Sequence, residues 1–558
     1  MRQQIEAALA DIAKRLYDFD GRVELTRPDE QFGDFSTNIA MQLAKPAGKN
    51  PREVAEAIAA ELRTDLSGQV TEVTIAGPGF INLRLSDAAL AQLVAQPVAQ
   101  VWSGKKILVE YSDPNPFKPL HAGHLYTTLV GDMISRLTAI AGAETIRLNY
   151  GGDVGLHAAK SMWSIVRFFG GEYPEKLDEV TIDGRPAWLG ARYVEGNNAY
   201  EDDEAAKAEI VACNRRIYGL HTDNDHESAF AQIYWTCRQW SYEYFEVLYQ
   251  QLQVVPFDRF IPESEVTPLG IATVAEQLEK GVFEKSGNAV IFDGERRGLH
   301  TRVFINSEGI PTYEAKDIGL ALTKWRDYQF DKSIIITANE QLQYMQVILA
   351  AIAEFEPEPA QRTTHLVHGV VKLQGGVKMS SRKGNIVTAL EILESARQAG
   401  AETGTNPTED TVLAAVKYAF AKNRIGGDIA YDPKESIALE GNSGPYLQYA
   451  HARACSILAK AADVQDDIGD TTLEPGERSL LRKIGEYTET VDKAVDELMP
   501  HHIATYLYEL SQAFNRFYEN NLVVGDPRQA VRLKLVEVYA FRLKSGLSLL
   551  GISAPERL

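Results

Sequence analysis

The tetrapeptide His121-Ala122-Gly123-His124 and its surroundings decide the fold of this chain. An apolar run at residues 107–111, typical of a buried strand, precedes it and is joined to it by a proline-rich turn. After it, apolar side chains recur at the spacing of one helical face: Leu129, Met133, Leu137 and Ile140. A strand, a tight loop and a helix in this order predict one unit of a doubly wound parallel sheet.

The loop at residues 121–124 is suited to binding phosphate. Ligands of doubly wound sheets lie at the carboxyl ends of the strands, where a helix N-terminus favours anions. His121 and His124 can donate hydrogen bonds to phosphate oxygens, and Gly123 leaves room for a flat adenine. We therefore expect the two histidines to hold ATP.

A second string, Lys378-Met379-Ser380-Ser381-Arg382-Lys383-Gly384, lies far downstream. Its two lysines, small hydroxyls and glycine are suited to a loop that closes over a triphosphate. Either string alone has an ordinary explanation, as a capping or core histidine pair or as a solvated lysine-rich turn. Together, and in this order, they predict a split site that activates a carboxylate with ATP.

The two strings resemble the H-x-G-H and K-M-S-K-S motifs of class I aminoacyl-tRNA synthetases. Residues 112–124 narrow the resemblance to arginyl-tRNA synthetases, because they are similar to that family's S-P-N-x-A-K-P-x-H-x-G-H segment, with Asp113 and Pro116 as departures. The resemblance implies that Asn115 contacts arginine. It implies catalytic roles for His121, His124, Lys378 and Lys383, and further ATP contacts from Pro114, Lys118, Gly123, Met379, Ser380 and Ser381.

Two further segments carry the carboxylates of the expected arginine pocket. Residues 257–264 are similar to the family's D-x-x-x-G-E-S segment, with Pro262 where glycine is usual, and this places Glu263 at the guanidinium. Residues 313–318 resemble the Y-x-x-x-D-I stretch, in which Tyr313 and Asp317 share one helical face. A guanidinium is planar, charged and rich in donors, so two carboxylates and an aromatic face select it over lysine.

Two more positions follow from the same resemblance. The family's glutamine contact falls within residues 338–343, and we take it as Gln341. Residues 149–155 resemble the N-x-x-G-D-x-G loop, which His157 follows where many members have glutamine. For His157, a structural partner and a substrate contact both remain open.

The composition is that of a large enzyme without a membrane span. With 558 residues we expect three or four domains, and the chain has no apolar stretch near twenty residues. Its start predicts a polar amphipathic helix and no signal peptide. Three cysteines without a C-x-x-C pair are typical of a reducing cytoplasm, where we place the protein: Cys213, Cys237 and Cys455. The net charge of −20 opposes a general RNA-binding footprint, although a local basic strip would suffice.

We expect an α/β protein with a Rossmann-like, doubly wound parallel-sheet catalytic domain, a small N-terminal α/β domain and an all-α C-terminal bundle. Residues 1–95 resemble the additional N-terminal domain that contacts the tRNA elbow in the family. Residues 100–400 form the catalytic domain, with a connecting insertion at about 171–255. Residues 401–440 form a linking helical region, and residues 441–558 resemble the all-helical anticodon-binding domain.

The resemblance implies an arginine–tRNA ligase that acts as a monomer, with L-arginine, ATP, magnesium and tRNA(Arg) as partners and no protein ligands for a metal. It also implies that tRNA must be present for the first step. Three alternatives remain. Another specificity, such as cysteine or glutamate, would need zinc-binding cysteines or a cationic pocket. A small-molecule nucleotidyltransferase would not need the terminal domains, and a non-catalytic RNA-binding relative would lack the histidines or loop lysines that are present here.

Overall fold

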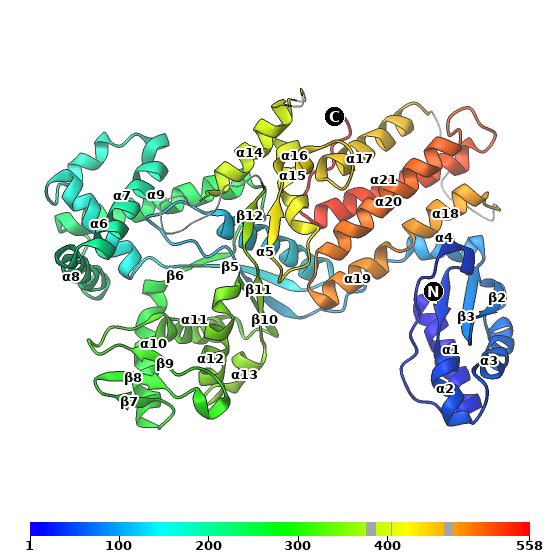
Figure 1. Ribbon diagram of the computed structural model, residues 1–558, viewed down its shortest axis with the longest axis horizontal. Coiled ribbons are helices and arrows are strands. Elements are labelled where there is room, and N and C mark those ends of the chain that lie inside the picture. The colour runs from blue at the N-terminus through cyan, green and yellow to red at the C-terminus, as the bar shows by residue number, and fades with distance from the viewer. Residues whose placement is uncertain (375–386, 403, 405, 462–471) are drawn as a thin grey trace.

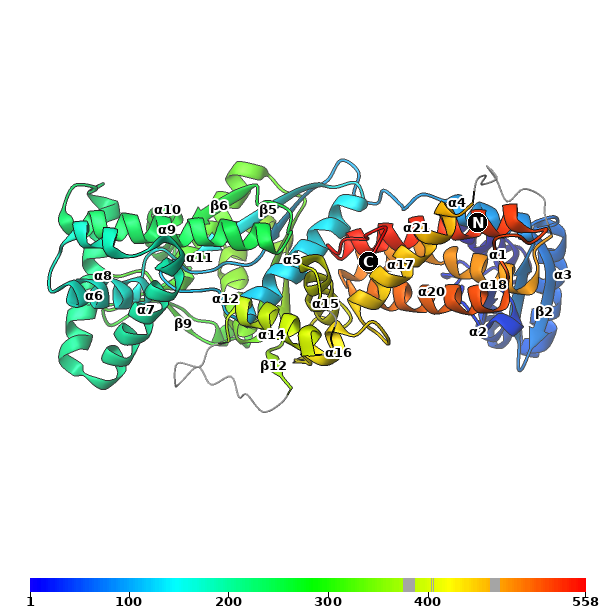
Figure 2. The same ribbon diagram turned by 90° about the horizontal axis from the view of Figure 1, so that it is seen from above.

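The computed structural model describes residues 1–374, 387–402, 404, 406–461 and 472–558. The molecule is elongated: the N-terminal module and a helical bundle lie at one end, and the parallel sheet with its inserted helices lies toward the other (Figure 1). The view from above shows the same order of parts (Figure 2). No helix of the described residues is long and apolar enough to cross a membrane.

The centre of the molecule is a parallel sheet of five strands in the order β11-β10-β4-β5-β6. The strands are β4 (Lys106–Glu110), β5 (Glu144–Gly151), β6 (Arg259–Pro262), β10 (Lys332–Ala338) and β11 (Thr363–His368). The chain starts at β4, adds two strands on one side and then crosses to the other side, so the order reverses between β4 and β10. Ligands of such sheets bind at this reversal. The predicted doubly wound fold is confirmed.

Helices inserted between β5 and β6 form a separate layer with its own apolar core. They are α6 (Leu156–Phe169), α7 (Arg185–Asp202), α8 (Glu204–Thr222) and α9 (Ala229–Gln251). The last helix returns to the sheet, because Ser241 on α9 accepts a hydrogen bond from the amide of Phe117, in the loop after β4. The insertion therefore supports the loop that leads to the histidine tetrapeptide.

A second set of elements lies between β6 and β10 and positions acidic side chains. It comprises α10 (Glu263–Glu279), the antiparallel strands β7 (Glu284–Ser286), β8 (Ala289–Phe292) and β9 (Arg302–Ile305), and α11 (Tyr313–Tyr328). A Cβ atom on Gly270 would lie 2.0 Å from the carbonyl oxygen of Ala315, and one on Gly319 would lie 2.2 Å from that of Val266. Two glycines thus allow α10 and α11 to approach closely, which brings their first turns together.

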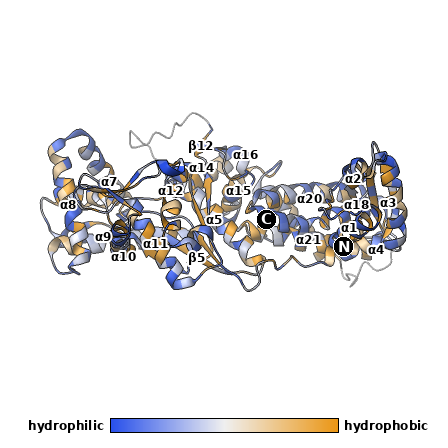
Figure 3. Ribbon diagram, turned by 90° about the horizontal axis from the view of Figure 1, so that it is seen from below, coloured by the Kyte–Doolittle hydropathy of each residue, from blue (hydrophilic) through white to orange (hydrophobic). Residues whose placement is uncertain are grey.

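The remaining elements divide between the two faces of the sheet. They are α5 (Ala122–Ile140), α12 (Leu342–Ala353), α13 (Pro357–Gln361), β12 (Val371–Leu373), α14 (Ala389–Glu402), α15 (Glu409–Ala421), β13 (Ile429–Tyr431) and α16 (Pro433–Ile437). Helices α12 and α13 lie in the same core as α10 and α11, and α5, α14 and α15 lie in the core that continues into the bundle. The bundle consists of α17 (Gly444–Ala459), α18 (Pro475–Ile484), α19 (Tyr487–Glu497), α20 (His501–Asn520) and α21 (Gln529–Leu549). Its helices carry both hydrophobic and hydrophilic residues (Figure 3).

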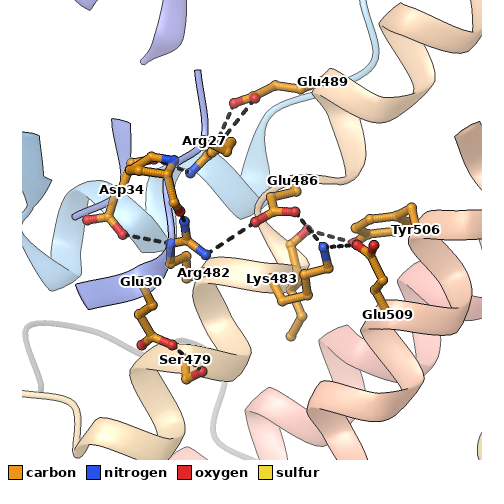
Figure 4. Close-up of polar contacts among 12 residues, drawn as sticks. Arg27, Glu30, Asp34, Ser479, Arg482, Lys483, Glu486, Glu489, Tyr506 and Glu509 are labelled. Carbon is orange, nitrogen blue, oxygen red and sulfur yellow. Dashed lines mark hydrogen bonds and ion pairs between the residues drawn. The ribbon is translucent and has the colours of Figure 1, made fainter. Parts of the chain in front are cut away.

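The N-terminal module consists of α1 (Arg2–Tyr17), β1 (Phe35–Thr37), α2 (Ile39–Ala47), α3 (Pro51–Asp65), β2 (Val70–Ala76), β3 (Phe80–Leu85) and α4 (Asp87–Ala95). It docks on the bundle through ion pairs, several of which Figure 4 shows. Asp34 is fully buried and lies 2.7 Å from the guanidinium of Arg478, and Glu489 pairs with Arg27 at 2.6 Å. Because a buried charge needs its partner, these pairs hold the module on the bundle in one orientation.

Candidate active site

A cavity of about 610 Å³ opens at the reversal between β4 and β10. Residues from the loop after β4, from β5, from α10 and α11, and from the end of β11 line it. The lining includes these residues predicted from the sequence: Asn115, His121, Gly123, His124, Glu263, Tyr313, Asp317 and Gln341. Pro114 and Lys118 lie outside the lining. Lys378, Met379, Ser380, Ser381 and Lys383 lie outside the described residues.

The two histidines sit at the start of α5, and their hydrogen bonds determine their tautomers. His121 is the N-cap of the helix, and its Nδ1 accepts hydrogen bonds from the amides of Gly123 (3.1 Å) and His124 (3.3 Å). Nδ1 of His124 accepts in turn from the amide of His121, at 3.4 Å. Since Nδ1 accepts in both rings, each neutral ring carries its proton on Nε2, which can donate to a phosphate oxygen.

The histidines are therefore capping residues and candidate phosphate donors at once. Their rings stack with centroids 3.7 Å apart. Burial lowers the pKa of His121 to about 4, and burial, together with the repulsion that a second protonated ring beside His121 would meet, holds the pKa of His124 well below its usual value. Both rings are thus neutral at pH 7, and positive charge at the phosphates has to come from other groups. The sequence predicted that the N-terminus of the helix would favour phosphate. In the structure, the amides of Gly123 and His124 instead donate to Nδ1 of His121.

Lys118 is a nearby source of positive charge. Its ammonium group lies 5.6 Å from the ring centroid of Tyr193, and burial lowers its pKa to about 8. The charge of Lys118 contributes to the low pKa values of His121 and His124. Lys118 itself does not line the cavity.

The loop between β4 and the histidines has an unusual backbone. Ser112, Asp113 and Phe117 have positive φ angles of 76°, 49° and 70°, which side-chain-bearing residues rarely adopt. Hydrogen bonds hold this conformation: the Ser112 hydroxyl lies 2.7 Å from that of Tyr249, and Oδ1 of Asp113 accepts from the amide of Tyr150 at 2.8 Å. Such strain persists only where the surroundings enforce it, and it is concentrated at functional sites.

The loop after β5 is tied to the same segment. Oδ1 of Asn115 accepts from the amide of Gly152 at 3.0 Å. Asp153 is fully buried and receives hydrogen bonds from Arg238 (2.9 Å) and from the Ser264 hydroxyl (2.6 Å). Asp153 thus joins the insertion to the start of α10. This explains physically why an acidic residue follows the glycines in this loop.

His157 has a structural partner. Its Nε2 hydrogen-bonds to the carbonyl oxygen of Gly152, and the ring is buried. Burial lowers the pKa of His157 to about 3, so the ring is neutral. Nδ1 has no hydrogen-bond partner among the residues that the structure describes. Of the two roles left open by the sequence, the contacts favour the structural one, since His157 fixes the carbonyl behind the Asn115 contact.

The two predicted carboxylates lie near the N-terminal ends of α10 and α11: Glu263 is the first residue of α10, and Asp317 begins the second turn of α11. Glu263 is buried and pairs with Lys316, whose ammonium nitrogen lies 2.6 Å from Oε2. Asp317 accepts a hydrogen bond from the Tyr344 hydroxyl at 2.6 Å. Burial raises the pKa of Asp317 to about 7, so its carboxyl group titrates near neutrality.

Several cavity residues were missed by the sequence argument. Glu110 ends β4 and pairs with Lys324 at 2.6 Å, with both side chains buried. His368 ends β11, and its Nε2 lies 2.7 Å from the hydroxyl of Thr127 on α5. The only signal for Glu110 and His368 in the sequence is their place at the carboxyl ends of strands. Lys316 and Lys324 carry no such signal, because a lysine on a helix is usually exposed.

Comparison with known proteins identifies the class to which this fold and site belong. Residues 87–431 match the family model for tRNA synthetases class I (R), catalytic domain. Residues 447–558 match the DALR anticodon binding domain, and residues 1–85 match the arginyl tRNA synthetase N terminal domain. The fold and site are therefore those of a class I aminoacyl-tRNA synthetase.

Individual relatives narrow this class to one family. The chain is 30% identical over 601 residues to an arginine–tRNA ligase of Porphyromonas gingivalis, covering 100% of this chain and 99% of that protein. It is 31% identical over 594 residues to one of Crocosphaera subtropica, covering 99% and 98%. The solved arginyl-tRNA synthetase of Thermus thermophilus matches with a TM-score of 0.80 at 26% identity, with 100% of both chains covered. The chain belongs to the arginyl-tRNA synthetase family.

Gly152 offers a test of how closely the backbone packs between the side chains of Asn115 and Glu263. A Cβ atom there would lie 2.5 Å from Oδ1 of Asn115 and 3.0 Å from Oε1 of Glu263. Gly152→Ala is therefore expected to lower the free energy of unfolding by about 1 to 3 kcal/mol through overpacking, measured by urea denaturation. Gly219→Ala is the matched control: nothing lies within 4 Å of its Cβ position inside α8, so it should be neutral or stabilising by up to about 1 kcal/mol. Equal effects of the two substitutions would contradict the close packing at Gly152.

Proposed function

We propose that this protein is an arginine–tRNA ligase that activates arginine with ATP and transfers it to the 3′ end of tRNA(Arg). The observation that carries the proposal is the cavity at the reversal of the sheet, which is lined both by two neutral histidines and by a group of acidic residues. The histidine end suits the phosphates of ATP, and the acidic end suits a cationic side chain. Membership of the arginyl-tRNA synthetase family supports the same assignment.

In the first step a carboxylate oxygen of arginine attacks the α-phosphorus of ATP. The bond from that phosphorus to pyrophosphate breaks, and arginyl-adenylate forms. His121 and His124 donate from Nε2 to the phosphate oxygens, where charge spreads in the transition state. Because both rings are neutral, the positive charge comes from Lys118, Lys378 and Lys383. Further ATP contacts come from Pro114, Gly123, Met379, Ser380 and Ser381.

Arginine lies at the acidic end of the cavity. We assign contacts to Asn115, Glu263, Tyr313, Asp317 and Gln341. The half-buried Asp317 carboxylate, fixed by the Tyr344 hydroxyl, accepts two hydrogen bonds from a guanidinium fork, whereas an ammonium offers only a point charge. In the second step the terminal ribose hydroxyl of tRNA attacks the activated carbonyl, and AMP leaves. Catalysis consists of positioning and electrostatic stabilisation, without a covalent intermediate on the protein.

Magnesium accompanies ATP in this proposal. Within residues 1–374, 387–402, 404, 406–461 and 472–558, no group of three or more His, Cys, Asp or Glu side chains is arranged to hold a metal ion. Mg²⁺ keeps several waters and binds readily through substrate phosphates. We therefore expect the phosphates to carry the ion, which would offset their charge as they enter the site.

The terminal domains supply the contacts to tRNA. The N-terminal module contacts the elbow, the helical bundle contacts the anticodon, and tRNA must be bound before arginine is activated. The ion pairs between module and bundle fix the distance between these two contact surfaces. The enzyme acts as a monomer in the cytoplasm.

The test is ATP–pyrophosphate exchange measured with each of the twenty amino acids, with and without a total tRNA fraction. We expect exchange with arginine alone, and only when tRNA is added. Exchange with a different amino acid would overturn the assignment of the acidic pocket. An absence of exchange under every condition would favour a non-catalytic role or a nucleotidyltransferase without tRNA.

Arginine affinity should depend on pH because Asp317 titrates near neutrality. Burial raises the pKa of this carboxyl group to about 7, and only its ionised form pairs with a guanidinium. The dissociation constant for arginine should therefore fall as the pH rises from about 6 to about 8, by up to about tenfold per pH unit below the pKa. Asp317→Asn should bind more weakly and show a shallower dependence. Calorimetric titration at several pH values measures both, and a pH-independent affinity in the unmodified protein would contradict the role of Asp317.

A further inference from the structure

Four buried polar side chains, the polar line, connect the inserted helices to α5. They come in turn from β5, from α9, from the loop after β4 and from α5, and all are at most 4% exposed: Asn149, Tyr249, Ser112 and Thr128. The Tyr249 hydroxyl stands in the middle, 2.9 Å from Nδ2 of Asn149 and 2.7 Å from Oγ of Ser112. Oγ of Ser112 lies 2.7 Å from the Thr128 hydroxyl. Hydrogen bonds therefore run without a break from α9 and β5 to α5.

The far end of the polar line reaches the histidine tetrapeptide. The Thr128 hydroxyl lies 2.7 Å from the carbonyl oxygen of His124, one helical turn earlier. A threonine hydroxyl holds one proton, and Ser112 and this carbonyl are both within its reach. Ser112, at a φ of 76°, also stands at the start of the strained loop that leads to His121. The loop before the tetrapeptide and the turn after it are thus fixed to one hydroxyl group, that of Ser112.

Tyr249 holds Ser112 from outside the cavity, because Ser112 lines the cavity and Tyr249 does not. The ring of Tyr249 packs against Phe257 with centroids 5.0 Å apart, a contact that holds the ring independently of its hydroxyl. Burial raises the pKa of Tyr249, so the hydroxyl keeps its proton. Since the side-chain amide of Asn149 already donates to this oxygen, the proton of Tyr249 is directed at Ser112.

We propose that Tyr249 is a positioning residue for arginine activation, which acts through Ser112 and Thr128 on the place of the two histidines. This inference rests on the proposed function, in which His121 and His124 donate to phosphate oxygens. Removal of the Tyr249 hydroxyl takes away the donor directed at Ser112, and the loop at positive φ loses a contact that offsets its cost. Because catalysis by positioning needs its donors at a fixed place, a shift of this loop lowers the rate of activation.

Tyr249→Phe tests the inference, because it removes the hydroxyl and keeps the ring. ATP–pyrophosphate exchange with arginine is measured on the full chain with a total tRNA fraction present. We expect kcat to fall by about tenfold or more, because a misplaced donor fails mainly in the transition state. KM for arginine should change less than about twofold, because the carboxylates assigned to the guanidinium lie on α10 and α11.

Tyr506→Phe is the matched control for the loss of a buried tyrosine hydroxyl. Tyr506 is 3% exposed, and its hydroxyl donates to the Ile484 carbonyl at 3.1 Å within the bundle. The substitution removes a similar hydrogen bond away from the loop after β4, so kcat should stay within about twofold of the unmodified value.

Thr128 gives a second test that does not depend on the Tyr249 variant. Thr128→Val removes the hydroxyl at nearly the same size, whereas Thr128→Ser keeps it. We expect kcat to fall by about tenfold in Thr128→Val and to stay within about threefold in Thr128→Ser. Lost packing does not explain such a difference, because serine is the smaller of the two replacements.

A double variant shows whether the hydroxyls act as one line. Because Tyr249 acts through Ser112, adding Tyr249→Phe to Ser112→Ala should lower kcat by less than about twofold more. Unchanged kcat in Tyr249→Phe, an equal loss in Tyr506→Phe, or losses that multiply in the double variant would each overturn the inference. If Tyr249→Phe fails to fold, the Thr128 pair decides, because equal rates in Thr128→Val and Thr128→Ser refute it. Failure of the unmodified protein to exchange pyrophosphate with arginine would instead refute the proposed function.

Discussion

The electrostatic constraint on which this site depends is the gathering of carboxyl groups at the reversal of a parallel sheet. An uncompensated buried charge costs several kcal/mol, so the buried carboxyl groups of the cavity wall require cations from within the protein or from a ligand. Helix α11 supplies two of them, Lys316 and Lys324, and carries Asp317 as well. Its position depends in turn on Gly270 and Gly319, which allow it to lie against α10. The packing of α11 against α10 therefore determines which charged side chains reach the pocket.

The histidine end depends on a different constraint, the strained loop after β4. Residues held at positive φ cost about 1 to 3 kcal/mol each, and a hydrogen bond to Ser241 of α9 and one from Tyr150 of β5 must offset this. The result is a rigid path from the strand to the N-cap of α5. Rigidity here matters for function, because a reaction that relies on positioning loses rate when its groups are misplaced by about 1 Å.

The sequence predicted some parts of the fold and the site, and other parts could be seen only in the structure. The unit around His121 follows from local pattern alone, because a strand, a glycine-containing loop and an amphipathic helix each have their own periodicity. Glu263 and Asp317 could be placed in one cavity through motif resemblance. Lys316 and Lys324 could not, since their burial results from the packing of α11 against the sheet. Asp34 and Arg478 are paired across most of the chain, a contact that no local pattern encodes. The roles of Lys378 and Lys383 stay predictions.

The account is tested most directly by a crystal structure of the protein with bound arginine. It predicts arginine in the cavity at the sheet reversal, with its guanidinium on Asp317 and its carboxylate at the end of the cavity that His121 and His124 line. Arginine bound elsewhere, or with its guanidinium out of contact with Asp317, would contradict the assignment of the acidic pocket on which the account rests.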